Sequence, residues 1–330
     1  MGVLIPESYG GADAGAMALA LMLEEIAAGD ASLSTALSVH NSLTSAAIMR
    51  FGSEEQRQKW LPRMAKGEIL GAFALTEAGA GSDASAIRCR AEKRGNGWRL
   101  KGTKLFVTSG SIAGVVVAFA VSDATAGKKG LSAFLVPPGI PGYAVSRTED
   151  KLGQKASETC QVEFNDMDLP ADALLGHEGE GYKIALANLE SGRIGIAAQS
   201  VGIARAAFEA ALSYAKERQT FGRPIIEHQA VSFRLADMAT EIEAARLLYL
   251  NAARLKEDGR PCLKEASMAK LYASEMAERV CSAAIQTHGG YGYVKGYPVE
   301  RLWRDARVCQ IYEGTSDIQR MVIGRALAGE

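Results

Sequence analysis

The sequence predicts an α+β protein, mostly α, with domains in the order helical, β-rich, helical. Apolar residues recur at helical spacing before residue 67 and again after residue 180, whereas short β-rich runs separated by turns fill the region between. The length of 330 residues also exceeds what one compact core usually holds. We therefore predict an N-terminal helical domain at residues 1–69, a central β-barrel domain at 70–178 and a C-terminal four-helix bundle at 179–330.

The first helical region covers about Asp13 to Lys66, and a second helical run within it covers about Leu33 to Phe51. Ser53 followed by Gln56 three residues later predicts a capping box. A third, short helix should begin there and end near Gly67.

The central region is predicted to contain short strands. Gly71–Thr76 should form the first strand, and the turn pair Asn96-Gly97 predicts a hairpin between Ile87–Lys93 and Trp98–Lys101. Further strands are expected at Lys104–Thr108, Val115–Val121, Leu131–Val136, Tyr143–Arg147 and Thr159–Phe164. Several short strands in ~100 residues are typical of a barrel or a sandwich.

Long helices return at Gly181. The second of them should end at Gly259-Arg260-Pro261, and a third is expected from Glu265 to about Thr287. Because these apolar-striped helices are joined by short breaks, we predict an antiparallel bundle.

Composition excludes several classes of function. The formal net charge is −1 without a basic block, which argues against a nucleic-acid surface. The four histidines and five cysteines lack metal-ligand spacing, so no metal site is predicted and the thiols are expected to be reduced. No apolar run is long enough for membrane insertion, and no signal peptide is recognisable at the N-terminus. We expect a cytoplasmic protein, or a mitochondrial matrix protein that has lost its leader.

A loop rich in small residues follows the first predicted strand, at Leu75–Asp83. Without bulky side chains, its backbone N–H groups can approach a flat polar ring or a phosphate. By itself such a loop is usually a tight turn. It lacks the GxGxxG pattern of a βαβ unit, so a Rossmann nucleotide site is excluded.

Four further motifs each have a plain structural interpretation. Lys104–Thr108 reads as an amphipathic strand with Phe106 in the core, and Leu189–Arg193 as a capped helix start. Glu217–Pro224 reads as a helix that ends at Gly222, and the glycines of Gln286–Tyr293 as a helix C-cap and turn.

The segment Ile311–Arg320 is the most informative stretch. It places the carboxylate of Glu313 in a turn between an aromatic residue and a glycine, just before a last helical run. A carboxylate in such a turn can be held over a flat cofactor, and exclusion of water would make it a stronger base.

These motifs, in this order and across nearly the whole chain, resemble the acyl-CoA dehydrogenases, flavoenzymes that remove two hydrogens from an acyl thioester. The resemblance implies FAD-dependent α,β-dehydrogenation of an acyl-CoA to the trans-2-enoyl-CoA, with Glu313 as base and flavin N5 as hydride acceptor. Some family members carry their base at the position of Gly192, which cannot act as one, so Glu313 is the single candidate. Residues 190–199 and 264–270 are most similar to short-chain and short/branched-chain members, which favours a C4–C6 acyl group and a role in fatty acid or branched-chain amino acid catabolism.

The resemblance also assigns binding residues. Phe106 stands where the family usually has tryptophan, so any role of an indole N–H is lost. The segment around Gln286 would reach the FAD of a neighbouring subunit. The residues implied for FAD are Leu75, Thr76, Phe106, Val107, Thr108, Arg218, Phe221, Gln229, Gln286, Gly289, Gly290, Thr315 and Asp317. Those implied for the acyl-CoA are Ser82, Tyr182, Glu190, Arg193, Tyr312 and Gly314.

An electron-transferring flavoprotein is the expected electron acceptor, and a homotetramer the expected assembly, from the resemblance alone. Family members normally have a helical pair before the stretch that matches Gly2–Gly11, and from the resemblance we expect this sequence to lack it. Three alternatives remain open. An acyl-CoA oxidase would release hydrogen peroxide, a flavin monooxygenase of the same fold would react with oxygen through its reduced flavin, and an inactive acyl-CoA-binding scaffold would purify without flavin.

Overall fold

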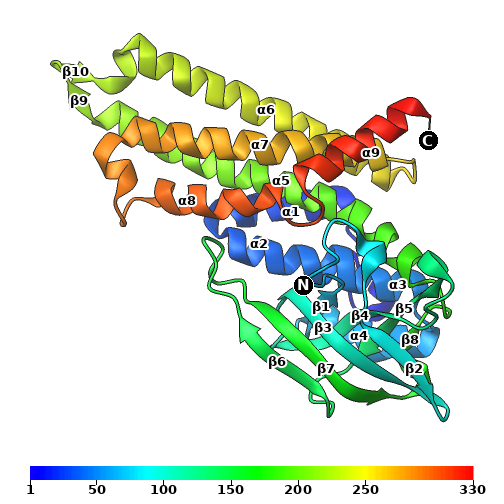
Figure 1. Cartoon of the computed structure of the whole chain (residues 1–330). Helices are drawn as coiled ribbons and strands as arrows, with labels where there is room; N and C mark the ends of the chain where they lie inside the picture. Colours follow the sequence, from blue (N-terminus) through cyan, green and yellow to red (C-terminus); the bar gives the residue numbers. More distant parts are fainter. Residues whose placement is uncertain (330) are drawn as a thin grey trace. The chain divides into compact units, whose positions relative to one another are not determined.

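The computed structural model describes residues 1–329, which form two compact units (Figure 1). Unit 1 comprises Met1–Gly15, Ala36–Asp150 and Ala156–Gly192, and it contains the sheet. Unit 2 comprises Ala16–Thr35, Lys151–Lys155 and the chain from Arg193 onward. The domain boundaries that we drew at 69/70 and 178/179 remain predictions.

The chain is mostly helical. The helices are α1 (Gly15–Gly29), α2 (Ala31–Ser38), α3 (Ala46–Phe51), α4 (Glu54–Lys66), α5 (Gly181–Glu217), α6 (Gln229–Glu257), α7 (Leu263–His288), α8 (Pro298–Ala306) and α9 (Ser316–Ala328). A π-helical segment, Val39–Ser45, joins α2 to α3. The predicted capping box is confirmed at Ser53 and Gln56, and α4 ends at Gly67 in the left-handed conformation.

The strands are β1 (Leu70–Ala74), β2 (Arg90–Arg94), β3 (Gly97–Thr108), β4 (Ala113–Val121), β5 (Leu131–Val136), β6 (Tyr143–Thr148), β7 (Thr159–Leu169) and β8 (Leu174–Leu175). Two short strands, β9 (Gln219–Thr220) and β10 (Arg223–Pro224), form a separate hairpin. The predicted hairpin at Asn96-Gly97 is confirmed, because β2 and β3 pair antiparallel across it.

The eight strands of unit 1 form one mixed sheet in the order β6-β7-β3-β2-β4-β5-β8, with β1 also paired to β4. Strand β4 organises this sheet, because its side chains alternate between two cores. Val115, Val117 and Phe119 face a core shared with α3 and α4. Val116, Ala118 and Ala120 face a second core, to which β3, β5 and β7 also contribute. A strand buried on both faces explains the unbroken apolar run in the sequence, and side chains of many strands converging on one core are typical of a barrel.

His40, in the π-helical segment, links the helices of unit 1 to the sheet. The Gly71 N–H donates to its Nδ1 (3.2 Å), so Nε2 carries the proton and donates to the Met64 carbonyl (3.2 Å). Burial lowers the pKa of His40 to about 4, which keeps the ring neutral.

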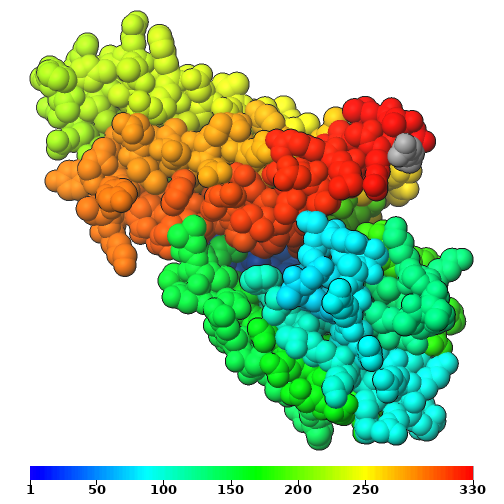
Figure 2. Space-filling view, viewed as in Figure 1, coloured from blue at the N-terminus to red at the C-terminus, as the bar shows by residue number. Residues whose placement is uncertain are grey.

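Unit 2 is a helical bundle whose α6 to α9 appear in yellow to red in Figure 2. The buried carboxylate of Glu24 on α1 accepts from Arg205 (3.2 Å) on α5 and from Arg246 (3.1 Å) and Tyr249 on α6. A Cβ at Gly202 would lie 2.1 Å from the Glu24 carbonyl oxygen, so α1 and α5 approach closely only because residue 202 is glycine.

Two structural interpretations of the sequence are wrong. Leu189–Arg193 is not a helix start, since α5 runs without a break from Gly181. Gly222 does not end a helix but forms the turn between β9 and β10, after α5 has ended at Glu217. Within the residues described, no helix is both long and apolar enough to cross a membrane.

Candidate active site

Glu313 lies in the turn between α8 and α9. Its backbone is left-handed (φ 54°), and so is that of Gly314 (φ 91°). The hydroxyl of Thr315 accepts from the Ile318 N–H and so caps α9. A left-handed glutamate is uncommon, and such backbone strain is concentrated at functional sites.

The carboxylate of Glu313 is desolvated. Both of its oxygens are buried and have no hydrogen-bond partner among residues 1–329. Burial raises the pKa of Glu313 to about 7, although the positive charges of Lys270 and Arg193 oppose this shift. Near neutral pH the group therefore exchanges a proton readily, as a general base must.

Tyr312, the neighbouring residue, is held by a polar network inside unit 2. Its hydroxyl donates to Gln199 Oε1 (2.6 Å), and Gln154 Nε2 donates to it (3.4 Å). Thr35 Oγ1 donates to Gln154 Oε1 (2.6 Å) and accepts from Gln199 Nε2 (2.7 Å). This network fixes the aromatic side of the turn, so any contact of Tyr312 with substrate would use its ring rather than its hydroxyl.

Arg193 lies close to the turn, and Gly314 is part of it. Arg193 is buried, and its Nη1 donates to Ser267 Oγ on α7 (3.4 Å). The Gly314 carbonyl accepts from Lys270 Nζ (2.7 Å). Asp317 is exposed in the first turn of α9.

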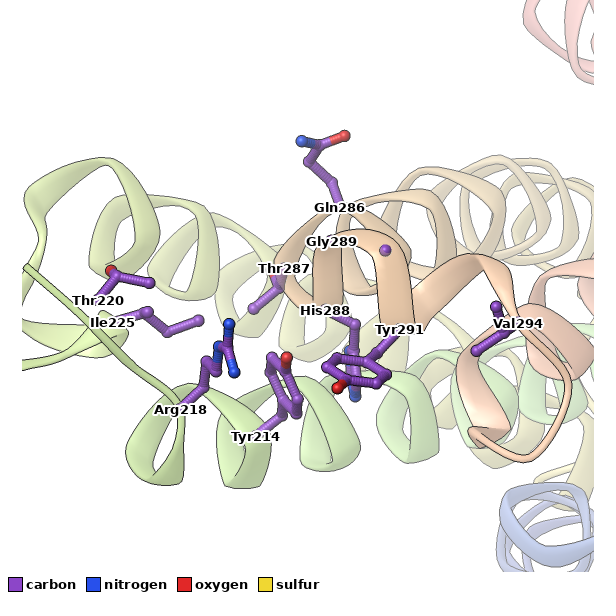
Figure 3. A pocket seen from close by; sticks show the side chains of 11 residues that line it. Tyr214, Arg218, Thr220, Ile225, Gln286, Thr287, His288, Gly289, Tyr291 and Val294 are labelled. Carbon is purple, nitrogen blue, oxygen red and sulfur yellow. The ribbon is translucent and has the colours of Figure 1, made fainter.

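A pocket of about 580 Å³ opens at the far end of α7 (Figure 3). It brings together four of the predicted FAD residues: Arg218, Gln286, Gly289 and Gly290. Tyr214 stacks on His288 (ring centroids 4.4 Å apart) within it. Gly289 caps α7 with a positive φ (61°), a conformation that glycine adopts readily, and this confirms the predicted C-cap. Lys270 and Thr287 lie about 25 Å apart along α7, so the pocket is remote from Glu313 in the same chain.

Phe221 and Gln229 lie near this pocket in sequence but do not line it. Phe221, between β9 and β10, is 97% exposed with a left-handed backbone (φ 53°). Gln229 is exposed at the first residue of α6.

In unit 1, the predicted FAD residues gather where β1 ends beside β3. The Thr76 carbonyl accepts from the Leu105 N–H (2.8 Å), and the Leu75 carbonyl accepts from Lys104 Nζ (3.1 Å). The structural interpretation that placed Phe106 in the core is wrong. Its side chain lies at a bulge in β3 and is 62% exposed. Val107 is the buried residue, and Thr108 is half-buried.

The remaining predicted substrate residues also belong to unit 1. Ser82 is exposed in the loop after β1. Tyr182 packs against the core beneath Lys128, whose Nζ lies 5.1 Å from its ring centroid. Glu190 is half-buried within α5.

Sequence reasoning missed Lys270 and the glutamines around the turn. Lys270 is a fully buried lysine on α7, and its one sequence signal is a charge inside an apolar helical stripe. Gln154, Gln199 and Gln319 are also buried, with no signal of their own in the sequence.

Comparisons with known proteins identify the family of the chain. Three family models match: acyl-CoA dehydrogenase N-terminal domain (residues 1–68), middle domain (72–167) and C-terminal domain (179–328). The chain belongs to the acyl-CoA dehydrogenase family. It is therefore an acyl-CoA-dehydrogenating flavoprotein oxidoreductase with FAD as cofactor, of a family that acts in fatty acid and branched-chain catabolism.

Three relatives illustrate the similarity. An acyl-CoA dehydrogenase of Bacillus subtilis is 50% identical over 100% of this chain and 87% of its own length. The human mitochondrial short-chain specific acyl-CoA dehydrogenase is 48% identical, over 97% of this chain and 77% of its own. The structure of butyryl-CoA dehydrogenase from Megasphaera elsdenii superimposes with a TM-score of 0.97 at 44% identity, covering 99% of this chain and 86% of that one.

The residues of the pocket fit part of FAD. Arg218 presents a guanidinium that has no ion-pair partner within residues 1–329, and a planar fork of this kind suits phosphate oxygens. An added Cβ at Gly289 or Gly290 would meet no atom within 4 Å, so the backbone there is open to a ligand. The exposed Phe106 of unit 1 offers an apolar face for a flat ring.

Proposed function

We propose that Glu313 is the base that removes the α-proton of a short-chain or short branched-chain acyl-CoA. The observation that carries this proposal is the desolvated carboxylate, whose pKa of about 7 suits proton transfer near neutral pH. Gly192 supplies no competing carboxylate at the other position that the family uses.

The backbone around Glu313 would assist the reaction. No hydrogen bond from the Glu313 N–H to another backbone group is found within residues 1–329. This N–H can therefore donate to the thioester oxygen as negative charge develops there, and a fixed donor of this kind contributes about 3–4 kcal/mol. Bound FAD supplies the two-electron acceptor, flavin N5, for the hydrogen that leaves the β-carbon.

We also propose that the pocket at the end of α7 serves the FAD of a second copy of the chain. Glu313 and the pocket are too far apart along α7 for the short ribityl chain of one FAD to connect them. A homotetramer would supply the second copy, and an electron-transferring flavoprotein would take the electrons.

The variant Glu313→Gln tests the assignment of the base. It removes the proton acceptor with little change in shape, so FAD content and acyl-CoA binding should persist while turnover with butyryl-CoA falls by at least about 10³-fold. Anaerobic bleaching of the flavin band by butyryl-CoA is the measurement, with wild type as the control. Bleaching at the wild-type rate in the variant would contradict the assignment.

The chain-length preference needs a separate measurement. Butyryl-CoA, hexanoyl-CoA, a singly branched acyl-CoA and octanoyl-CoA would be compared by kcat/KM. A preference for octanoyl-CoA would refute the short-chain proposal without affecting the role of Glu313.

A further inference from the structure

Lys270 is a buried charge for which the proposed chemistry has no use. Its side chain is fully buried on α7, and burial lowers its pKa to about 8. Keeping an ammonium group out of water is costly, so a specific interaction must retain it. Its Nζ donates to the Gly314 carbonyl at 2.7 Å, directly after Glu313.

A second buried side chain holds the same carbonyl. Gln319 Nε2 donates to the Gly314 carbonyl oxygen (2.9 Å) and to the backbone carbonyl oxygen of Glu313 (3.4 Å). The two donors come from different helices, Lys270 from α7 and Gln319 from α9, and these helices pack together in unit 2. The peptide group that joins Gly314 to Thr315 is therefore held by donors from two helices.

The turn requires such fixing. Both residues of the Glu313-Gly314 pair are left-handed, a conformation that a glutamate rarely adopts unless its surroundings impose it. The space beside Gly314 is also filled, because a Cβ there would lie 2.8 Å from Gln319 Nε2. A turn released from these two donors would be free to move its carboxylate and its N–H together.

We propose that Lys270 and Gln319 are positioning residues that clamp the Gly314 carbonyl, hold Glu313 in its left-handed conformation and so aim its carboxylate and its N–H. This inference rests on the proposed role of Glu313. The two residues differ in one respect, since Gln319 acts through hydrogen bonds alone whereas Lys270 also brings a positive charge.

The charge gives Lys270 an effect that a purely structural residue would lack. The charged groups facing Glu313 are Lys270 from α7 and Arg193 from α5, and both favour the carboxylate. Lys270 itself faces Glu313, Cys309, Glu275 and Arg193. Removing the ammonium should therefore raise the pKa of Glu313, so that the base becomes active only at higher pH.

The experiment compares the variants Lys270→Met, Gln319→Met and Lys264→Met by the pH profile of kcat/KM with butyryl-CoA. Lys264 is the matched control, because it is partly exposed on the same helix and pairs with Glu265. In Lys270→Met the acid limb should move upward by about one pH unit, which alone lowers kcat/KM at pH 7 about fivefold, and loss of the clamp should lower it further. In Gln319→Met, kcat should fall at least about fivefold while the acid limb of the pH profile stays at its wild-type position. Lys264→Met should match wild type.

Thermal unfolding distinguishes a variant that does not fold from a folded variant in which Glu313 is out of position. Methionine is close to lysine in volume, so Lys270→Met should unfold within a few degrees of wild type. A folded Lys270→Met with the wild-type profile would overturn the proposal. If Lys270→Met does not fold, Gln319→Met decides, and wild-type turnover in it would overturn the clamp. Turnover in Glu313→Gln would instead refute the role of Glu313 itself.

Discussion

Glu313 combines a strained backbone with a desolvated carboxylate, and each has a distinct consequence. The left-handed φ places Gly314 and its carbonyl where Lys270 reaches them. The loss of water raises the pKa of the carboxyl group to about 7. A glutamate in an ordinary exposed turn would be fully ionised at that pH but would be a weaker base.

The activity of the wild-type enzyme should therefore decline in mildly acidic solution. Because only the ionised Glu313 accepts a proton, kcat/KM should fall about tenfold for each pH unit below the pKa of about 7. The measurement is kcat/KM with butyryl-CoA from pH 5 to 9, where FAD content is checked at each pH. An acid limb near pH 4.5 would mean that the free enzyme leaves Glu313 hydrated.

Glu313 could be predicted as the base from the sequence because a glutamate between tyrosine and glycine is a local pattern. It could not identify Lys270, which is distant in sequence from Gly314 and meets it only when α7 packs against α9. The position of Phe106 could not be predicted from the sequence either. Its spacing suited a core position, but a bulge between β3 and β7 turns the ring outward.

Strand β3 carries the link that positions the loop after β1. Lys104 is fully buried on this strand, and its Nζ donates to Glu77 Oε1 (2.7 Å) and to the Leu75 carbonyl. Glu77 also accepts from the backbone N–H groups of Arg88 (2.6 Å) and Cys89 (2.9 Å). One ion pair thus joins β3, the loop after β1 and the residues that directly precede β2.

Breaking that pair should destabilise unit 1. Lys104→Met leaves the mostly buried Glu77 carboxylate without its cation, so the free energy of unfolding should fall by about 3 kcal/mol. Urea unfolding is the measurement, and the double variant with Glu77→Gln should recover part of the loss. Lys101 lies on the same strand as Lys104 and forms an exposed ion pair with Asp166 of β7, so Lys101→Met should change the free energy of unfolding by less than ~1 kcal/mol. Equal effects of the two lysine variants would contradict this account.

Most elements were predictable because their signals are local. The Asn96-Gly97 turn, the Ser53–Gln56 capping box and the apolar stripe of α7 each specify structure within a few residues. The continuity of α5 was not predictable in this way. Small residues at 191 and 192 suggested a break, whereas the long helix tolerates them within its run.

At the scale of the whole molecule, the proposed sharing of the FAD site between copies predicts complementation. Glu313→Gln and Arg218→Met should each be inactive alone, since one lacks the base and the other a cofactor ligand. In mixed oligomers, an intact Glu313 of one copy can meet an intact Arg218 of another, so activity should return. The measurement is turnover of co-expressed, differently tagged chains purified by both tags.

The control is each variant co-expressed with a differently tagged copy of itself, which should stay inactive. If mixed oligomers are equally inactive, Arg218 and Glu313 must act on the same FAD from one chain. Recovery would show that no single copy of the chain holds a complete site.

The neutral ring of His40 couples the integrity of unit 1 to acidity. Its pKa of about 4 in the folded protein lies below its ordinary value of 6.5, so unfolding takes up a proton at any pH between the two. The stability it contributes is complete above pH 6.5 and is lost progressively as the pH falls toward 4. A histidine that ties strand to helix thus also makes unit 1 less stable in mildly acidic solution, which sets an acid threshold for storing and handling the enzyme.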